Sequence, residues 1–378
     1  MHVFTSVTAN YLPKAAVLAH SVKRVHPDAV FHVVLSDRLP DCPRATIAAF
    51  DSIISIDELP IKNQSSWIFK HRLVELCTGV KGAAFQYIAD RHRAERIFYF
   101  DPDIVVLDRL DDLVRTLDRH SILLTPHQTV PEAEVQAILD NEICCLRHGV
   151  YNLGFLAVRM TDEGRRFIAW WADRLRGFCY DDVPGGLFTD QRWVDLAPAF
   201  FEDIAIVRDP QYNVATWNLT HRRATGCAPH EIRINGRPLV FYHFSGFDSG
   251  AQEVMLKRYG SDSPVLFDLR EWYINRCEEL GQSTLGRIEC IYDSFRNGRR
   301  ITDAHRLLYR SREDLVQAFP DPYDASDPRR SYFHWYRAHP RASDRRPFLM
   351  RLRDHAPTPA LQLARTARSA WRRWSQTG

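Results

Sequence analysis

The segment Arg96-Ile-Phe-Tyr-Phe-Asp101-Pro-Asp103-Ile-Val-Val-Leu107 decides the fold, because two acidic residues and a proline separate two short apolar runs in it. The aromatic and β-branched residues of these runs are typical of buried strands. In an extended chain Asp101 and Asp103 point to the same side, and Pro102 has no N–H to donate within a sheet. We therefore expect the chain to leave a sheet here, at a strand end of the kind where α/β sheets bind ligands.

Two carboxylates that converge on one point suit Mg²⁺ or Mn²⁺, whose remaining positions are filled by water, a further side chain and substrate phosphate oxygens. A polar turn that caps a core strand has the same sequence pattern. The Asp-x-Asp pair alone leaves both interpretations open.

The chain before this segment alternates strand and helix at the spacing of βαβ units. This alternation predicts a doubly wound α/β sheet with ligands at its strand ends. A long helix, Trp67 to Asp90, is expected to lead into the central segment. The earlier elements are a strand at 2–7, a helix at 14–25, a strand at 31–35, a helix at 43–50 and a strand at 53–56.

Three downstream segments carry further candidate residues. An apolar strand at 149–158 contains Asn152 and Gly154, and a helix begins at Asp190-Gln191, where an acidic residue also suits a helix N-terminus. The segment 232–246 has an Asn-Gly pair typical of a hairpin turn and places His243 at the end of its second strand. Histidine is a good metal ligand, although a single histidine is more often structural.

Beyond about residue 252 the strand patterns end and helices are expected at 265–280, 285–295 and 304–319. We predict three units: a catalytic domain at 1–255, a helical subdomain at 256–340 and a basic amphipathic tail at 341–378. The tail alternates arginines with apolar residues and tryptophans, which suits peripheral contact with an anionic membrane. Packing on the body or disorder at a terminus fits the tail equally well.

Composition sets broad limits on function. The 378 residues are 45% hydrophobic and 26% charged, as in ordinary globular proteins, and the net charge of +3 is too small to indicate a nucleic-acid partner. The first residues lack a signal-peptide pattern and no apolar stretch is long enough to span a membrane. We expect a cytoplasmic protein, with or without peripheral contact to the inner face of the membrane.

Five short motifs, taken in order, resemble those of the retaining GT-A glycosyltransferases of family 8, the group that includes glycogenin and bacterial lipopolysaccharide glycosyltransferases. The resemblance covers roughly residues 1–250, and its motifs are 4–11, 100–103, 151–154, 190–191 and 243–246. It implies a GT-A fold, a Rossmann-like and mostly parallel mixed sheet flanked by helices, here with a helical C-terminal extension.

The resemblance also implies roles for individual residues. Residues around the nucleotide base would be Thr8, Ala9, Asn10 and Tyr11. Ligands of Mn²⁺ or Mg²⁺ would be Asp101, Asp103 and His243. Residues lining the sugar would be Asn152, Gly154, Asp190 and Gln191. A basic residue on the helix before the Asp-x-Asp strand would face the donor, with Lys81 as the first candidate and Lys70 as the second.

One feature departs from the family pattern. The histidine motif of the family usually continues to a lysine that touches the diphosphate, whereas this chain has Ser249 at that offset. Another base, such as Lys257 or Lys81, would have to supply the charge, or the metal would carry more of it.

The implied function is a metal-dependent, retaining transfer of a hexose from a nucleotide-diphosphate sugar, with UDP expected, to a glycan, lipid-linked or protein acceptor in bacterial surface polysaccharide or glycoconjugate synthesis. We expect same-face attack, with Asp190 positioning donor hydroxyls and Gln191 stabilising the transient cation. Two alternatives remain, an inverting enzyme on the same fold and a nucleotide-sugar-binding protein without turnover.

Overall fold

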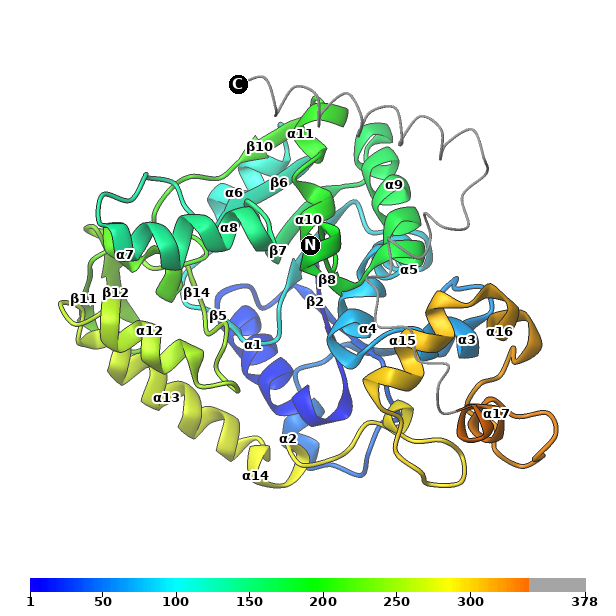
Figure 1. The fold of residues 1–378 in the computed structure, drawn as a ribbon. Coiled ribbons are helices and arrows are strands. Elements are labelled where there is room, and N and C mark those ends of the chain that lie inside the picture. Colours follow the sequence, from blue (N-terminus) through cyan, green and yellow to red (C-terminus); the bar gives the residue numbers. More distant parts are fainter. Residues whose placement is uncertain (340–378) are drawn as a thin grey trace, which may run out of the picture.

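The computed structural model describes residues 1–339, and the predicted basic tail lies outside them. At the centre is a seven-stranded sheet in the order β10-β6-β7-β4-β1-β2-β3 (Figure 1). Strand β7 pairs antiparallel with β4 and β6, and the other neighbouring strands pair parallel. The strands are β1 His2–Val7, β2 Val30–Leu35, β3 Ser52–Ser55, β4 Arg96–Phe100, β6 Ile122–Pro126, β7 Tyr151–Arg159 and β10 Ile204–Ile206.

Helices cover both faces of this sheet, because successive strand residues point to opposite sides. On β4, Ile97 and Tyr99 enter one hydrophobic core, whereas Phe98 and Phe100 enter another. Helices α5 (Lys81–Arg91) and α9 (Asp162–Phe178) pack in the first core. Helices α1 (Leu12–Val25) and α6 (Asp111–Leu117) pack in the second. The predicted α/β class, a mostly parallel sheet flanked by helices, is confirmed.

One edge of the sheet collects the candidate residues. The parallel strands β1, β2, β4 and β6 all end there, and β7 begins there because it runs in the opposite direction. Beyond this edge, β5 (Ile104–Val106) pairs antiparallel with β14 (Phe241–His243) in a separate two-stranded sheet. Residues far apart in the sequence therefore meet at one place.

The predicted hairpin at 232–246 is correct only in its first half. Strands β12 (Glu231–Ile234) and β13 (Arg237–Pro238) pair across the Asn235-Gly236 turn, where both residues have positive φ. The chain then leaves β12, and β14 pairs with β5 instead, which buries Phe241 and Tyr242 in two different cores. Burial of these rings explains why the hairpin ends early.

The single long helix predicted at 67–90 is wrong. The chain forms three helices there, α3 (Gln64–Phe69), α4 (Leu73–Gly79) and α5. The buried guanidinium of Arg306 donates to the carbonyl oxygens of Phe69 and His71, and the carboxylate of Glu75 accepts from the backbone N–H of Arg72. These contacts complete the backbone hydrogen bonding at the break between α3 and α4.

The C-terminal region is helical, as predicted, but the helix expected at 285–295 is absent. In its place α14 ends at Leu285 and one short 3-10 turn, Ile291–Asp293, follows. The ring of Phe69 contacts Tyr309 and Tyr332, so the last three helices of this region share a core with one face of the sheet. Its helices are α12 Ala251–Tyr259, α13 Val265–Glu279, α14 Gln282–Leu285, α15 Asp303–Ser311, α16 Glu313–Ala318 and α17 Tyr332–Ala338.

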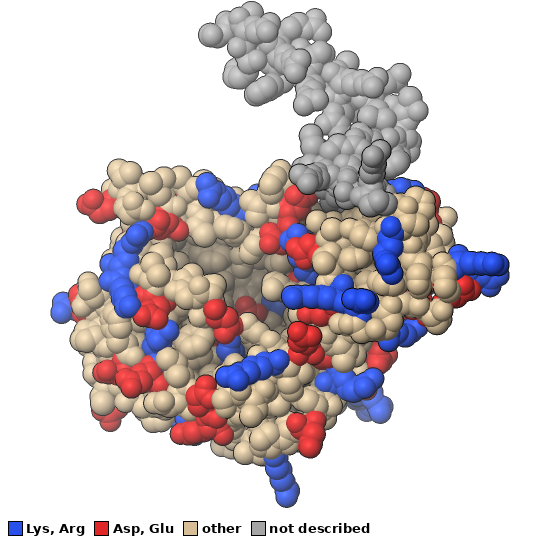
Figure 2. All heavy atoms as spheres, turned by 60° about the horizontal axis from the view of Figure 1, so that its bottom comes forward, with Lys and Arg blue, Asp and Glu red and all other residues tan. Residues whose placement is uncertain are grey.

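The remaining elements are short and connect the larger ones. They are α2 Arg44–Ile47, α7 Val135–Ala137, α8 Ile143–His148, α10 Gln191–Val194, α11 Ala197–Phe200, β8 Asp181–Asp182, β9 Leu187–Phe188 and β11 Ala224–Cys227. Within residues 1–339 the helices are too short or too polar to cross a membrane. Figure 2 shows acidic and basic side chains interspersed around a hollow in one face.

Candidate metal centre

Three predicted metal ligands come together at the sheet edge. Asp101 follows β4, Asp103 precedes β5, and His243 ends β14, directly opposite Ile104. Nε2 of His243 lies 3.1 Å from Oδ1 of Asp103 and 3.9 Å from Oδ2 of Asp101. Each residue offers one ligand atom, and the three atoms lie within 4.8 Å of one another. Two carboxylates and an imidazole suit Mn²⁺ or Mg²⁺, so the donor set fits such an ion.

The electrostatics of these residues favour a cation between them. Burial alone would lower the pKa of His243, but the carboxylates of Asp103 and Asp101 outweigh it and raise that pKa. Burial would raise the pKa of Asp103, yet His243 lowers it. A divalent ion bound between these residues would compete with a proton for His243, because a metal-ligating imidazole nitrogen has to be deprotonated.

The Asn-x-Gly motif of β7 supports the imidazole. Oδ1 of Asn152 lies 3.2 Å from Nδ1 of His243 and also accepts from the backbone N–H of Gly154 and from Nδ2 of Asn213. A Cβ atom at Gly154 would lie 2.5 Å from Cε1 of His243, closer than any real contact. Residues 152 and 154 therefore hold the ring in place, and their contact with a sugar stays a prediction.

Lys81 lies inside the site, at the start of α5. Its ammonium is 2.9 Å from Oδ2 of Asp190 and 3.3 Å from Oδ1 of Asp101, and it donates to the carbonyl oxygen of Leu153 at 3.0 Å. Burial would lower the pKa of Lys81, but the two carboxylates outweigh it and raise that pKa. The second candidate, Lys70, lies instead near Glu313 of the C-terminal region, and burial lowers its pKa.

Asp190 and Gln191, at the start of α10, are buried and bonded. Burial raises the pKa of Asp190, against the opposite effect of Lys81. The side-chain amide of Gln191 accepts from the N–H of Leu153 at 3.1 Å and donates to the carbonyl of His148 at 2.9 Å. With exposures of 2% and 8%, neither side chain is freely open to a substrate in this structure.

The predicted base-binding residues follow β1 at the same sheet edge. The hydroxyl of Thr8 donates to Oδ1 of Asn10 at 2.6 Å, and the backbone N–H of Ala9 donates to Oδ2 of Asp37 at 3.1 Å. The hydroxyl of Tyr11 donates to the carboxylate of Asp248. These contacts fix the loop in place, and its interaction with a base stays a prediction.

Three residues around the metal centre, Tyr99, His127 and Trp217, belong to none of the five motifs. The hydroxyl of Tyr99 donates to Oδ1 of Asp101 at 2.5 Å, which the two-residue strand period could have indicated. His127 lies 3.1 Å from the amide of Asn152, and burial lowers its pKa to about 4, so the ring is neutral. The ring of Trp217 packs edge-on against His243, a contact with no local sequence signal.

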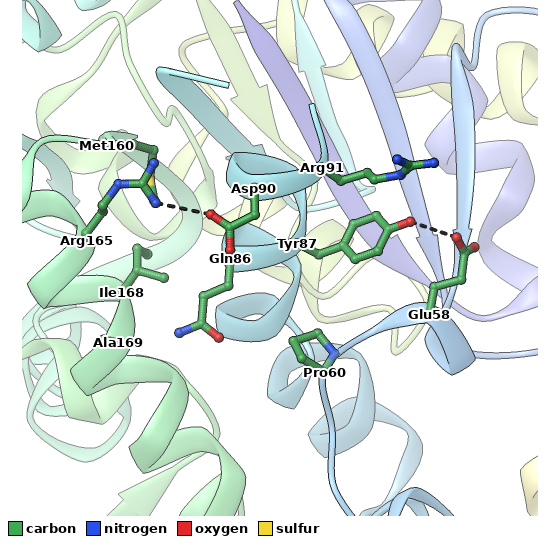
Figure 3. A pocket seen from close by; sticks show the side chains of 10 residues that line it. All are labelled: Glu58, Pro60, Gln86, Tyr87, Asp90, Arg91, Met160, Arg165, Ile168 and Ala169. Atoms are coloured by element: carbon green, nitrogen blue, oxygen red, sulfur yellow. Dashed lines mark hydrogen bonds and ion pairs between the residues drawn. The ribbon is translucent and has the colours of Figure 1, made fainter. Parts of the chain in front are cut away.

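A large cavity of the described residues lies away from these groups. It has a volume of about 710 Å³ and lies between α5 and α9 (Figure 3). Its lining residues form an ion pair, Arg165 with Asp90, and a hydrogen bond from the hydroxyl of Tyr87 to Glu58. None of its lining residues belongs to the candidate set, so the convergence of chemical groups, and not cavity size, locates the site.

No protein-family model matches the chain. The chain is similar to the uncharacterized protein YfnF of Bacillus subtilis (strain 168), with 23% identity over 255 residues, which are 64% of this chain and 80% of YfnF. It is also similar to the uncharacterized protein YfnD of the same organism, with 27% identity over 176 residues, 46% of this chain and 54% of YfnD.

Among solved structures, it resembles the galactosyltransferase LgtC in complex with donor and acceptor sugar analogues, with 18% identity, a TM-score of 0.47 and coverage of 74% of this chain and 96% of LgtC. It also resembles the glycosyltransferase GlyE of Streptococcus pneumoniae TIGR4, with 15% identity, a TM-score of 0.40 and coverage of 73% and 64%.

Proposed function

We propose that this protein is a metal-dependent glycosyltransferase that moves a hexose from a nucleotide-diphosphate sugar, with UDP expected as the nucleotide, to a glycan, lipid-linked or protein acceptor. The observation that carries the proposal is the convergence of Asp101, Asp103 and His243 at the sheet edge where β1 ends and the loop after it begins. A nucleotide on that loop would direct its phosphates toward the three ligands.

The chemistry of sugar transfer fits this arrangement. Negative charge develops on the diphosphate as the bond to the sugar breaks, and Asp101, Asp103 and His243 would hold a divalent ion that would supply positive charge there. Nδ1 of His243 faces Asn152, and this contact orients Nε2 toward the two carboxylates. Lys81 holds Asp101 and Asp190 in place as a buried counter-charge.

We infer retention of the anomeric configuration by same-face attack. A covalent intermediate needs a strong nucleophile at the anomeric carbon, whereas the amide of Gln191 is a poor nucleophile and the carboxylate of Asp190 is paired with the ammonium of Lys81. Asp190 would position donor hydroxyls, Gln191 would stabilise the transient cation, and the donor phosphate would accept the acceptor's proton. The setting proposed for this reaction is the cytoplasm, in synthesis of a bacterial surface polysaccharide or glycoconjugate.

The test is turnover of UDP-hexoses with Mn²⁺ or with a chelator. Asp103→Asn should lower metal-dependent release of UDP by about 100-fold or more, because a ligand to the charge-stabilising ion is lost. The exposed Asp28→Asn is the matched control and should behave as wild type. Full activity of Asp103→Asn in chelator would contradict the proposal.

The stereochemistry has its own measurement. Proton NMR of the product's anomeric coupling should show the configuration of the donor sugar. An inverted product would point to an inverting enzyme on this fold. Binding of the sugar nucleotide without hydrolysis or transfer, across many acceptors, would point to a binding protein.

A further inference from the structure

Lys14 is a buried cation with a partly exposed anionic partner. It lies in the first turn of α1, three residues after Tyr11, and its side chain is only 2% exposed. Its ammonium is 2.5 Å from Oδ1 of Asp248, whose side chain is 50% exposed. The same ammonium lies over the rings of Tyr11 and Phe247, at 4.3 and 5.4 Å from their centroids.

The two elements that carry this ion pair adjoin the metal centre. Helix α1 packs against β5, and the hydroxyl of Ser21 accepts the backbone N–H of Val106 at 3.0 Å. The N–H of Phe244 donates to the carbonyl of Asp103 at 2.9 Å, so the loop that carries Asp248 starts at the metal centre.

The other lysines considered for the diphosphate are occupied or remote. Lys81 is bonded to two carboxylates and a carbonyl, as described above. Lys257 is 65% exposed on α12 and pairs with Glu253, and Lys70 lies near Glu313. Lys14, in contrast, is on the helix that directly follows the predicted base-binding loop, and its partner Asp248 is on the loop that follows His243.

A purely structural role explains Lys14 poorly. An ion pair with a half-exposed carboxylate stabilises a fold little, whereas burying an ammonium has a large desolvation penalty. An apolar side chain of similar length would fill the same space at lower free energy. Buried charges retained against this penalty are common at binding sites.

We propose that Lys14 binds the diphosphate of the donor and supplies the charge that the loop after His243 lacks, with Asp248 holding the ammonium until the donor binds. This inference rests on the proposed function. Two metal-bound carboxylates cancel most of the charge of a divalent ion, so a further cation is needed to balance both phosphates. Lys14 enters the site from the helix that follows the base-binding loop, and not from the loop that follows the histidine.

The experiment is a binding titration of UDP, GDP, CDP and ADP, each with Mn²⁺, on wild type and variants. Lys14→Met should weaken binding of the preferred diphosphate about tenfold or more and leave the matching nucleoside nearly unchanged. Asp248→Asn breaks the same ion pair but keeps the ammonium and an acceptor for Tyr11. It should tighten diphosphate binding by up to about fivefold, because a competing anion is removed.

Lys257→Met is the matched control, since it removes a lysine charge on the exposed surface of α12, and should bind as wild type. The double variant Lys14→Met with Asp248→Asn leaves no unpaired charge. It should unfold at the wild-type midpoint and still bind the diphosphate weakly.

Three results would overturn this inference and leave the proposed function standing. They are equal binding by Lys14→Met and wild type, equal weakening in Lys14→Met and Asp248→Asn, and equal weakening in Lys14→Met and Lys257→Met. If wild type binds none of the four diphosphates, the proposed function fails together with it.

Discussion

Two lysines are buried at the same edge of the sheet, and their partners differ. Lys81 lies between Asp101 and Asp190, and Asp190 is itself buried. Lys14 pairs with Asp248, which is half exposed on a loop. In the first case both charges are enclosed by protein, and in the second the carboxylate is already hydrated.

The difference separates a charge that maintains the site from one that is available to a ligand. Removing Lys81 would leave the buried carboxylate of Asp190 without a counter-charge, which has a large energetic penalty. Removing Lys14 would leave Asp248 half exposed to water and still bonded to the hydroxyl of Tyr11, which has a small penalty. Substitution of Lys81 should therefore act mainly on stability, and substitution of Lys14 mainly on ligand affinity.

The largest expected effect is on the stability of Lys81→Met. Loss of the buried counter-charge should lower the free energy of unfolding by about 3–5 kcal/mol, as measured by urea denaturation. The double variant Lys81→Met with Asp190→Asn should recover much of this loss, since it removes the unpaired charge. A loss below about 1 kcal/mol would show that the Lys81 cluster does not stabilise the fold.

Gly154→Ala should act on the metal centre next. The new methyl group would displace the ring of His243, which should lower Mn²⁺ affinity about 10- to 100-fold in a titration of the free ion. Gly177→Ala on α9 is the matched control, because a Cβ there has no atom within 4 Å. Wild-type Mn²⁺ affinity in Gly154→Ala would mean that the imidazole is not a ligand.

Lys14→Met should have the smallest effect on stability. Its free energy of unfolding should change by less than about 1 kcal/mol, because the lost pair involves a half-exposed carboxylate. The same urea measurement compares it directly with Lys81→Met. Equal losses of unfolding free energy in the two variants would show that both lysines stabilise the fold to the same extent.

Much of the fold followed from the alternation of strands and helices and from the acidic break after β4. The three-part helix at 64–91 did not, because its break depends on Arg306, more than 200 residues away in the sequence. Local periodicity carries no information about such a tertiary contact. The early end of the predicted hairpin has a similar cause, since burial of Phe241 decides it.

The candidate site was predictable where a motif ends a strand. Asp101, Asp103 and His243 meet as expected, and Lys81 reaches Asp101 from the preceding helix. The pairing of Lys14 with Asp248 spans 234 residues. Lys14 itself lies in a helix whose sequence indicated only an apolar face. The spatial partners of a charge decide its role, and one sequence does not supply them.

The most direct test of the central claim is a thermal-shift panel of UDP, GDP, CDP and ADP, each with Mn²⁺ and with chelator, on wild type and Asp103→Asn. A ligand at a hundred times its dissociation constant adds about 2.7 kcal/mol to native stability, a shift of a few degrees for a chain of this size. The account predicts a shift for one nucleotide that requires metal and disappears in the variant. No shift with any nucleotide, or a shift indifferent to both metal and Asp103, would contradict it.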